Sequence, residues 1–458
     1  MTPPTDRRSA NAVKKPYKGM ASSSRSRPAS WSEAQAEAHL RSLELFGMRF
    51  GLDRMRRMMT VLGSPQRRFH SIHVVGTNGK TSTTRMVAAI LQRHGLSTAT
   101  YTSPHLISYR ERLQIGERDC GADAFAGAIA CAAWAAERVN RTLSGDDHVT
   151  QFELLTAAAL WEIAEQGVQV AAIEAGLGGR YDATAVIESR VTALTNVGLE
   201  HTRWLGPTLR DIAEEKLAVV RPGTTLVLGA DLAPEALTVA ERVAHERRAR
   251  IVTAPAGWSG AALGARGEFQ QRNFSLARVV AETYLRDAGI EPREAAVRDA
   301  AGATEVRGRL QVVRRDPLTV LDGAHNPDAV RALVASLPDV VGQRPLAVVL
   351  GVLEDKDAVG MLAPLLAVAE RAWFTAPPSE RALSPAALQS LARQLGFERV
   401  SCEPRPERAL ADAQSWAGGH GAAVLATGSV YLVGDLLGGL AGEGAAQESR
   451  DPRRRAAS

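Results

Sequence analysis

A glycine-rich loop restricts what this chain can fold into more than any other part of its sequence: Gly76-Thr77-Asn78-Gly79-Lys80-Thr81-Ser82. It follows His70–Val75, which alternates between polar and apolar residues and then ends apolar, as a buried strand can, and it precedes residues 83–93, which have the pattern of a helix. In that position the glycines let consecutive N–H groups face an anion, while Lys80 offers an ammonium group to phosphates. The GxxxxGK[ST] pattern is not met, because Val74 occupies its first glycine position. We predict a nucleotide-phosphate site here; the alternative is an ordinary strand-to-helix loop.

Strand-like runs alternate with helical segments along the whole chain, which predicts an α/β fold with a mostly parallel sheet covered on both faces. The first series of runs comprises residues 96–101, 168–173, 191–195 and 225–228. A second, shorter series comprises residues 318–321, 346–350, 372–375 and 422–426. A polar link at residues 305–309 separates the two series. Because 458 residues are too many for one ordinary core, we predict two domains, at residues 31–306 and 307–442.

The basic character of the chain is concentrated at its ends. The formal net charge is +5, but seven Lys or Arg residues against one acid lie in the first 29 residues. We therefore predict a disordered basic extension at residues 1–30 and a disordered tail at residues 443–458, and no nucleic-acid partner. No apolar run is long enough for a membrane span. Three cysteines without a CxxC pair indicate a reducing compartment, so the predicted location is the cytoplasm.

Polar clusters follow the ends of three further predicted strands, where parallel sheets form their ligand crevice. These clusters read TSPHL at residues 102–106, EAGLGGRYDAT at 174–184 and TNVGLEH at 195–201. Glu174 ends an apolar strand, where an unpaired carboxylate would be costly, and one carboxylate beside phosphates suits Mg²⁺. The imidazole of His201 could ligate a metal or position a phosphate. Taken singly, a Ser-Pro turn, an exposed glutamate and a structural histidine are the alternatives.

Two short blocks in the second predicted domain also combine charge with tight turns: Gly308-Arg309-Leu310 and LDGAHNP at residues 321–327. Asp322 could accept hydrogen bonds from nucleotide hydroxyls, and Arg309 could stack on a base or bind phosphate. His325 could face the reacting phosphoryl group across the crevice. An Asp-Gly turn leading into a proline-started helix explains the second block equally well.

In this order, the blocks resemble those of the folylpolyglutamate synthase/dihydrofolate synthase family, a branch of the Mur ligase superfamily. The resemblance covers roughly residues 43–434. It implies a P-loop Mur-ligase-type ATPase domain joined to a smaller Rossmann-like C-terminal α/β domain. Two departures are visible: Thr81 stands where many members have glycine, and Glu200 stands where aspartate is more frequent, with Arg203 and Trp204 after it.

The resemblance also implies a role for each matching residue. The ATP contacts would be Thr77, Asn78, Gly79, Lys80, Thr81, Asn273, Arg309 and Asp322. The metal ligands would be Ser103, Glu174 and His201. Lys216 matches the lysine that is carbamylated in this family, and the catalytic residues would be Lys80, Lys216 and His325. The pterin would be bound by Gly47, Met48, Arg49, Phe50, Thr150, Gln151, Phe152, Glu153, Tyr181, Asp182 and Ala183.

The activity implied is ATP-dependent ligation of L-glutamate to dihydropteroate and to tetrahydrofolate through an acyl phosphate, so we predict a bifunctional enzyme. Its cofactors would be ATP and Mg²⁺, and a monovalent cation such as K⁺ is a further candidate. Its partners would be small molecules alone, without nucleic acid or membrane, and the chain would act as a monomer.

Two other functions compete with this one. A cell-wall Mur ligase would use the same chemistry on another carboxylate, but such enzymes usually carry a UDP-binding domain before the phosphate loop. Only about 45 residues with an ordered pattern precede that loop here, too few for a typical domain. A nucleotide-binding module without ligase activity would leave the EAGLGGR and DGAHNP blocks unexplained.

Overall fold

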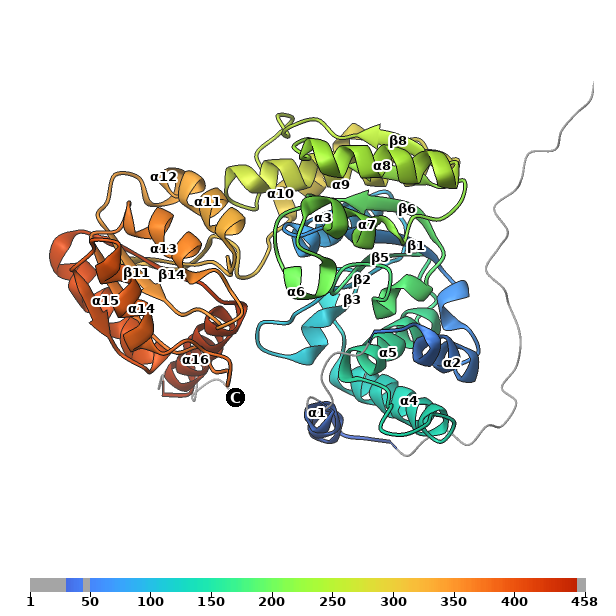
Figure 1. Ribbon diagram of the computed structural model, residues 1–458, viewed down its shortest axis with the longest axis horizontal. Helices are drawn as coiled ribbons and strands as arrows, with labels where there is room; N and C mark the ends of the chain where they lie inside the picture. The colour runs from blue at the N-terminus through green and yellow to red at the C-terminus, as the bar shows by residue number, and fades with distance from the viewer. Residues whose placement is uncertain (1–29, 44–49, 451–458) are drawn as a thin grey trace, which may run out of the picture.

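The computed structural model of the chain describes residues 30–43 and 50–450 (Figure 1). The predicted basic extension, apart from Ser30, lies outside the described residues. So do Gly47, Met48 and Arg49 of the predicted pterin-binding set. Figure 1 shows a blue-to-yellow first part and a smaller orange-to-red second part lying side by side.

The first part is built on an eight-stranded sheet in the order β4-β3-β2-β5-β1-β6-β7-β8. The pairs from β2 to β8 are parallel, whereas β3 and β4 add an antiparallel edge. The strands are β1 His70–Val75, β2 Thr98–Tyr101, β3 Leu113–Ile115, β4 Arg118–Asp119, β5 Val170–Glu174, β6 Ser189–Leu194, β7 Thr225–Leu228 and β8 Arg250–Thr253. The predicted mostly parallel sheet is confirmed. Strands β3, β4 and β8 are additions to the prediction.

Helices cover both faces of this sheet because its strands send apolar side chains to both sides. Ile72 and Val74 of β1 pack on α3, α9 and α10, while Val75 packs on α7 and α8 on the other face. Helices α4 and α5 cover the β2–β5 side. The helices are α1 Glu33–Ser42, α2 Asp53–Val61, α3 Lys80–Arg93, α4 Ala122–Asn140, α5 Gln151–Glu165, α6 Thr202–Leu205, α7 Leu209–Leu217, α8 Pro234–Arg247, α9 Glu268–Asp287 and α10 Glu294–Ala303, with short 3₁₀ turns at Pro65–Arg67, Tyr109–Arg112 and Ala183–Val186.

The second part has its own six-stranded sheet, in the order β13-β12-β11-β14-β10-β9. All its pairs are parallel except β9 with β10. The strands are β9 Gln311–Arg315, β10 Leu318–Leu321, β11 Leu346–Leu350, β12 Arg371–Phe374, β13 Val400–Cys402 and β14 Ala423–Thr427. The helices are α11 Pro327–Ser336, α12 Pro338–Val341, α13 Ala358–Leu366, α14 Pro385–Gln394, α15 Pro406–His420 and α16 Val430–Arg450. The predicted link at residues 305–309 falls between α10 and β9.

The last helix differs from the prediction of a disordered tail at residues 443–458. Helix α16 continues to Arg450, and residues 451–458 lie outside the described part. Alanine, glutamate and glutamine at residues 443–448 have high helix propensity, which the charge-based prediction did not weigh.

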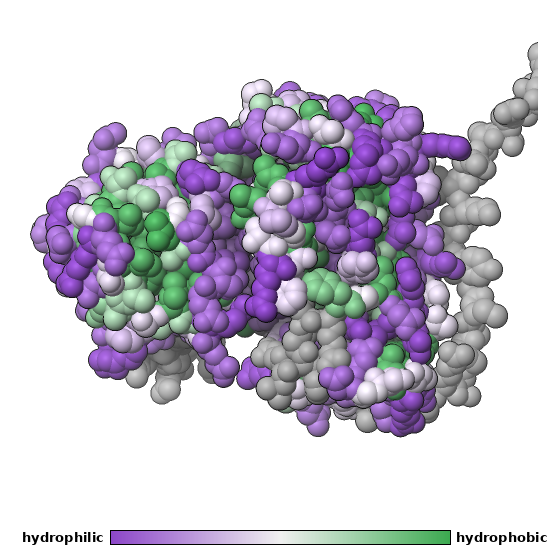
Figure 2. All heavy atoms as spheres, in the orientation of Figure 1, coloured by the Kyte–Doolittle hydropathy of each residue, from purple (hydrophilic) through white to green (hydrophobic). Residues whose placement is uncertain are grey.

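Figure 2 shows hydrophilic side chains over most of one face of both parts, with smaller hydrophobic areas on each. None of the described helices combines the length and apolar character that a membrane span requires. The loops that leave the carboxyl ends of β1, β2, β5 and β6 carry predicted site residues, and they line cavities together with residues of the second part.

Candidate active site

The glycine-rich loop turns directly from β1 into α3. Gly76 has a φ of 150° and Gly79 a φ of 81°, both positive. A Cβ atom at Gly76 would lie 1.8 Å from Thr195 Oγ1, and one at Gly79 would lie 2.3 Å from Asn273 Oδ1, so larger side chains do not fit at either position. Lys80 opens α3, and its Nζ donates to the carbonyl of Thr77 at 3.0 Å. The first N–H groups of α3 and the ammonium of Lys80 therefore lie together at a helix N-terminus, as an anion site requires.

The strand-end block after β6 holds this loop in place. Thr195 Oγ1 donates to the carbonyl of Asn78 at 2.6 Å, and the N–H of Asn78 donates to Asn196 Oδ1 at 2.9 Å. Thr77 Oγ1 accepts from the N–H of Gly198 at 3.0 Å. Thr195 and Asn196 belong to the predicted polar cluster at residues 195–201, but their supporting roles could not be predicted, because only the folded sheet brings β6 beside β1.

Glu174 is fully buried at the end of β5. Thr81 Oγ1 donates to its carboxylate at 2.8 Å, and the N–H of Ser103 donates at 3.2 Å. Burial raises the pKa of Glu174, and the charge of Lys80 only partly counters that rise. No cation among the described residues forms an ion pair with this carboxylate. Such a carboxylate is a suitable ligand for a divalent cation.

His201 and Glu174 line the same cavity. It takes a left-handed conformation with a φ of 54° as it enters α6, a sparsely populated conformation for a residue with a side chain. Burial lowers its pKa to about 4, so its imidazole is neutral and able to ligate a metal at neutral pH.

Ser103, Glu174 and His201 line one cavity of about 170 Å³ together with the glycine-rich loop. Within the described ranges no group of three His, Cys, Asp or Glu side chains could hold a metal alone. Mg²⁺ usually keeps several waters and binds through one or two carboxylates plus substrate phosphates. The donors present therefore fit a Mg²⁺ site that a nucleotide completes.

Lys216 reaches the glycine-rich loop from α7. It is buried in α7, and its Nζ donates to the carbonyl of Gly76 at 2.8 Å. Burial and the nearby charge of Lys80 lower the pKa of Lys216 to about 7. Gly179 makes this approach possible, because a Cβ atom there would lie 2.7 Å from the carbonyl oxygen of Lys216.

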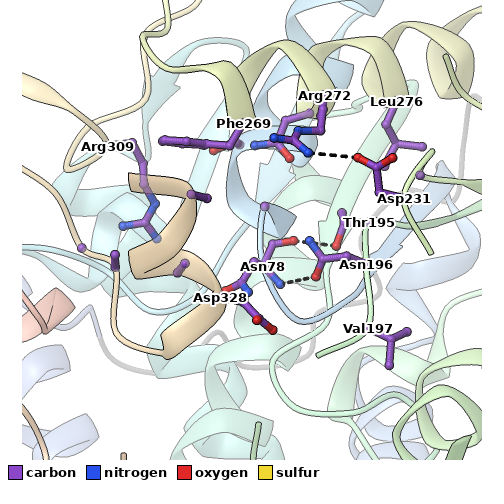
Figure 3. Close-up of a pocket in the computed structure, with 18 of the residues that line it drawn as sticks. Asn78, Thr195, Asn196, Val197, Asp231, Phe269, Arg272, Leu276, Arg309 and Asp328 are labelled. Carbon is purple, nitrogen blue, oxygen red and sulfur yellow. Dashed lines mark hydrogen bonds and ion pairs between the residues drawn. The ribbon is translucent and has the colours of Figure 1, made fainter. Parts of the chain in front are cut away.

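A second cavity of about 320 Å³ adjoins the first and contains most of the predicted ATP contacts (Figure 3). Asn78 and Asn273 line it from the first part of the chain, and Arg309 and Asp322 from the second. Figure 3 shows Arg309 on the opposite side of the cavity from Asn196. The two oxygens of Asp322 accept from the N–H groups of Leu310 and Ala324, each at 2.8 Å, so this carboxylate also holds the local loop.

Polar side chains join the two parts of the chain at and beside the glycine-rich loop. Asn78 and Asn326 exchange amide hydrogen bonds, of 2.9 and 3.3 Å. Lys356 Nζ lies 3.0 Å from Glu200 Oε1, and His325 Nε2 lies 3.4 Å from the same oxygen. Burial alone would raise the pKa of Glu200, but hydrogen bonding and charge from His325, with Lys356, lower it below its ordinary range. The sequence analysis missed Lys356, which has no motif of its own.

The TSPHL loop also reaches the second part of the chain. Leu106 packs with the core formed around α16, and a Cβ atom at Gly434 of that helix would lie 2.0 Å from the carbonyl oxygen of Leu106. Ser103 and Leu106 therefore connect the predicted metal site and the other domain through one short loop.

None of the predicted pterin residues that the structure describes lines the cavity beside Glu174, which they approach at Gly176. Thr150 caps α5 and pairs with Glu153, whose carboxylate also accepts from the buried Arg54 at 3.0 Å. Phe152 packs on Gly176, where a Cβ atom would lie 2.5 Å from its ring. Gln151 donates to Tyr109 at 3.2 Å.

The remaining pterin candidates divide between the interior and the surface. Asp182 accepts from the N–H of Leu177 at 2.8 Å, and Ala183 is buried beside it. Phe50, Tyr181 and Trp204 are exposed, with the Phe50 ring centroid 6.1 Å from Tyr181 and 5.5 Å from Trp204. Trp204 was not among the predicted site residues.

Family models match most of the folded chain. Residues 74–258 match the Mur ligase middle domain, and residues 308–430 match the Mur ligase glutamate ligase domain. The folylpolyglutamate synthase of Lacticaseibacillus casei is 33% identical over 362 residues, which cover 73% of this chain and 84% of that protein. The dihydrofolate synthase/folylpolyglutamate synthase of Escherichia coli is 29% identical over 422 residues, which cover 89% of this chain and 94% of that protein.

Solved structures agree with these relatives. The Mycobacterium tuberculosis folylpolyglutamate synthase complexed with ADP superposes with a TM-score of 0.81 at 30% identity, over 89% of this chain and 99% of that one. Escherichia coli FolC in complex with DHPP and ADP superposes with a TM-score of 0.79 at 27% identity, over 91% of this chain and 99% of that one.

Proposed function

Because the chain belongs to the folylpolyglutamate synthase/dihydrofolate synthase family of Mur ligases, we propose that it uses ATP to join L-glutamate to both dihydropteroate and tetrahydrofolate. The observation that carries this proposal is the cavity in which the phosphate loop, Glu174 and His201 from the first part meet His325 from the second. A ligase that must first phosphorylate a carboxylate and then admit an amine needs groups from both sides of such a cavity.

The reaction has two steps. A carboxylate oxygen of the acceptor attacks the γ-phosphorus of ATP, the bond to the β-phosphate oxygen breaks, and ADP leaves. The amine of glutamate then attacks the carbonyl carbon of the acyl phosphate, loses a proton and displaces inorganic phosphate. Catalysis consists mainly of positioning and charge neutralisation, which we assign to Lys80 and the loop N–H groups.

We propose that His325 faces the transferred group from the second domain. Its Nδ1 lies 2.8 Å from the carbonyl oxygen of Gly323, which can only accept, so Nδ1 carries a hydrogen. Its Nε2 points toward Glu200 at the cavity. The side chain is thereby oriented by two contacts, which supports a role in positioning the phosphoryl group.

We assign the Mg²⁺ site to Ser103, Glu174 and His201, whose geometry and buried charge fit it. When bound there, the ion would neutralise part of the phosphate charge. We propose domain limits at residues 31–306 and 307–442, supported by their separate sheets and cores. A monomer is supported by a site built from one chain, and a cytoplasmic location by three unpaired cysteines.

Bifunctionality is tested by supplying ATP, Mg²⁺ and L-glutamate with either dihydropteroate or tetrahydrofolate. We expect phosphate release with each acceptor, dependent on glutamate in both cases. Release with one acceptor alone would identify a specialised enzyme. Release only with a UDP-muramoyl peptide would assign the chain to the cell-wall ligases. If none of these acceptors gave phosphate release, a nucleotide-binding module would be favoured.

We also propose that Lys216 is carbamylated, since carbon dioxide reacts with a neutral amine. A pKa of about 7 makes the amine increasingly neutral as pH rises through 7. With ¹³C-labelled bicarbonate, we expect a carbamate signal by NMR that grows between about pH 6 and pH 8. The signal should be absent from Lys216→Gln and present in Lys356→Gln, which removes another buried lysine. A signal that survives Lys216→Gln would contradict the assignment.

A further inference from the structure

Arg85 presents an unpaired guanidinium group to the cavity beside Glu174. It lies in α3, one helical turn beyond Thr81, and its side chain lines that cavity. Its Nε atom is buried, and no described atom accepts a hydrogen bond from it. Arg85 also forms no ion pair within residues 30–43 and 50–450. A desolvated charge without a partner is costly, so the site calls for an anion.

The carboxylates whose charge acts on Arg85 already have other partners. Asp119 accepts from Gln114 at 2.8 Å and lies 4.0 Å from Arg307. Glu111 accepts from the N–H groups of Leu106, Ile107 and Ser108 at 2.9 to 3.1 Å. Glu174 accepts from Thr81 and from the backbone of Ser103. Burial lowers the pKa of Arg85, and the charges of Asp119, Glu111 and Glu174 do not offset that effect. The missing anion is therefore expected to come from a substrate.

The position of Arg85 indicates which substrate. The cavity of about 320 Å³ that contains most of the predicted ATP contacts shares Asn78, Gly79 and Arg309 with the cavity of about 170 Å³ beside Glu174. Arg85 lines only the cavity beside Glu174. The predicted pterin residues approach the cavity beside Glu174 at Gly176, where Phe152 packs. Arg85 instead lies near Glu111, Asp119 and Arg307, whose charges act on it, and it lines the cavity together with the TSPHL loop and Arg307. Because these neighbours belong to neither the predicted ATP contacts nor the predicted pterin set, we assign this part of the cavity to the third substrate.

We propose that Arg85, with Arg307 beside it, binds a carboxylate of the incoming L-glutamate. The proposal rests on the ligase function given above. Glutamate must keep its amine free for attack, so it can be anchored only through its carboxylates and short carbon chain. The planar fork of a guanidinium matches a carboxylate with two parallel hydrogen bonds. The Arg307 side chain is 45% exposed, and its ion pair with Asp119 is long, at 4.0 Å. Arg307 can therefore turn toward the same ligand.

The test is a steady-state comparison of Arg85→Met with the unmodified enzyme, varying one substrate at a time. We expect the KM for glutamate to rise about tenfold to a hundredfold, the cost of losing hydrogen bonds between charged groups. The KM values for ATP and dihydropteroate should change less than about twofold. Arg93→Met is the matched control, since Arg93 lies on the same helix but pairs with Glu117 and Asp299 away from the cavity.

Each other result has a defined meaning. An unchanged glutamate KM in folded Arg85→Met overturns the proposal, and a rise confined to the KM for ATP overturns it by assigning Arg85 to phosphate. If Arg85→Met does not fold, Arg85→Lys is the deciding variant. It keeps the charge but loses the planar guanidinium, so we expect the glutamate KM to rise by about threefold or more. Absence of glutamate-dependent phosphate release by the unmodified enzyme would instead reject the ligase function itself.

Discussion

Replacing Lys80 by alanine is expected to slow ligation by about a thousandfold or more, comparable to losing other cations that contact a transferred phosphoryl group. Lys80 is the cation that opens α3 inside the phosphate loop, where its Nζ already returns to the carbonyl of Thr77. It packs against no apolar core cluster, so the fold should survive. The measurement is kcat from phosphate release, with thermal unfolding as the check on folding.

The control for this experiment is Arg393→Ala, which removes a cation from the surface of α14, where it lies 3.7 Å from Glu398. Its kcat should stay within about twofold of the unmodified enzyme, as for most surface changes. Near-normal turnover by a folded Lys80→Ala variant would reject the assignment of the glycine-rich loop to ATP phosphates.

Glu174→Gln is expected to separate stability from activity. The substitution keeps shape and an acceptor for Thr81 and Ser103 but removes a negative charge that burial disfavours. We expect an unfolding temperature equal to or above that of the unmodified protein without Mg²⁺. Turnover should fall about a hundredfold or more, and the Mg²⁺ concentration for half-maximal rate should rise, since charge stabilisation at phosphate is lost.

Glu188→Gln provides the matched comparison, because Glu188 is exposed and pairs only weakly with Arg67 at 3.3 Å. It should change neither turnover nor the Mg²⁺ requirement. Unchanged Mg²⁺ dependence in Glu174→Gln would show that the metal, if needed, is held elsewhere.

The central strands could be predicted from sequence because they are buried on both faces. His70–Val75, Thr225–Leu228, Leu318–Leu321 and Leu346–Leu350 were predicted with the bounds that the structure has. All the missed strands except β3 lie at sheet edges, where exposure breaks the apolar run: β8 and β13 have no fully buried residue. Helix α3 begins at Lys80, three residues before the prediction, because the turn at Gly79 lets the polar Lys80-Thr81-Ser82 run form its first turn.

The site could be predicted only as far as local patterns extend. Loops after consecutive parallel strands meet at one sheet edge, so Lys80, Ser103, Glu174 and His201 come together as expected. Arg85 and Lys356 have no such pattern. Their importance depends on which carboxylates lie nearby and whether these are already paired, and a linear sequence does not contain that information.

The close approach between Leu106 and Gly434 has a consequence for inhibitor design. Because a single short loop carries both Ser103 and Leu106, a small molecule bound between that loop and α16 would displace Ser103, the proposed metal ligand, without occupying any substrate's place. Such a compound would not be outcompeted by the high intracellular concentration of nucleotide. Resistance by enlarging the residue at 434 would be self-defeating, since any side chain there would collide with the loop's own backbone and disable the enzyme in the same way.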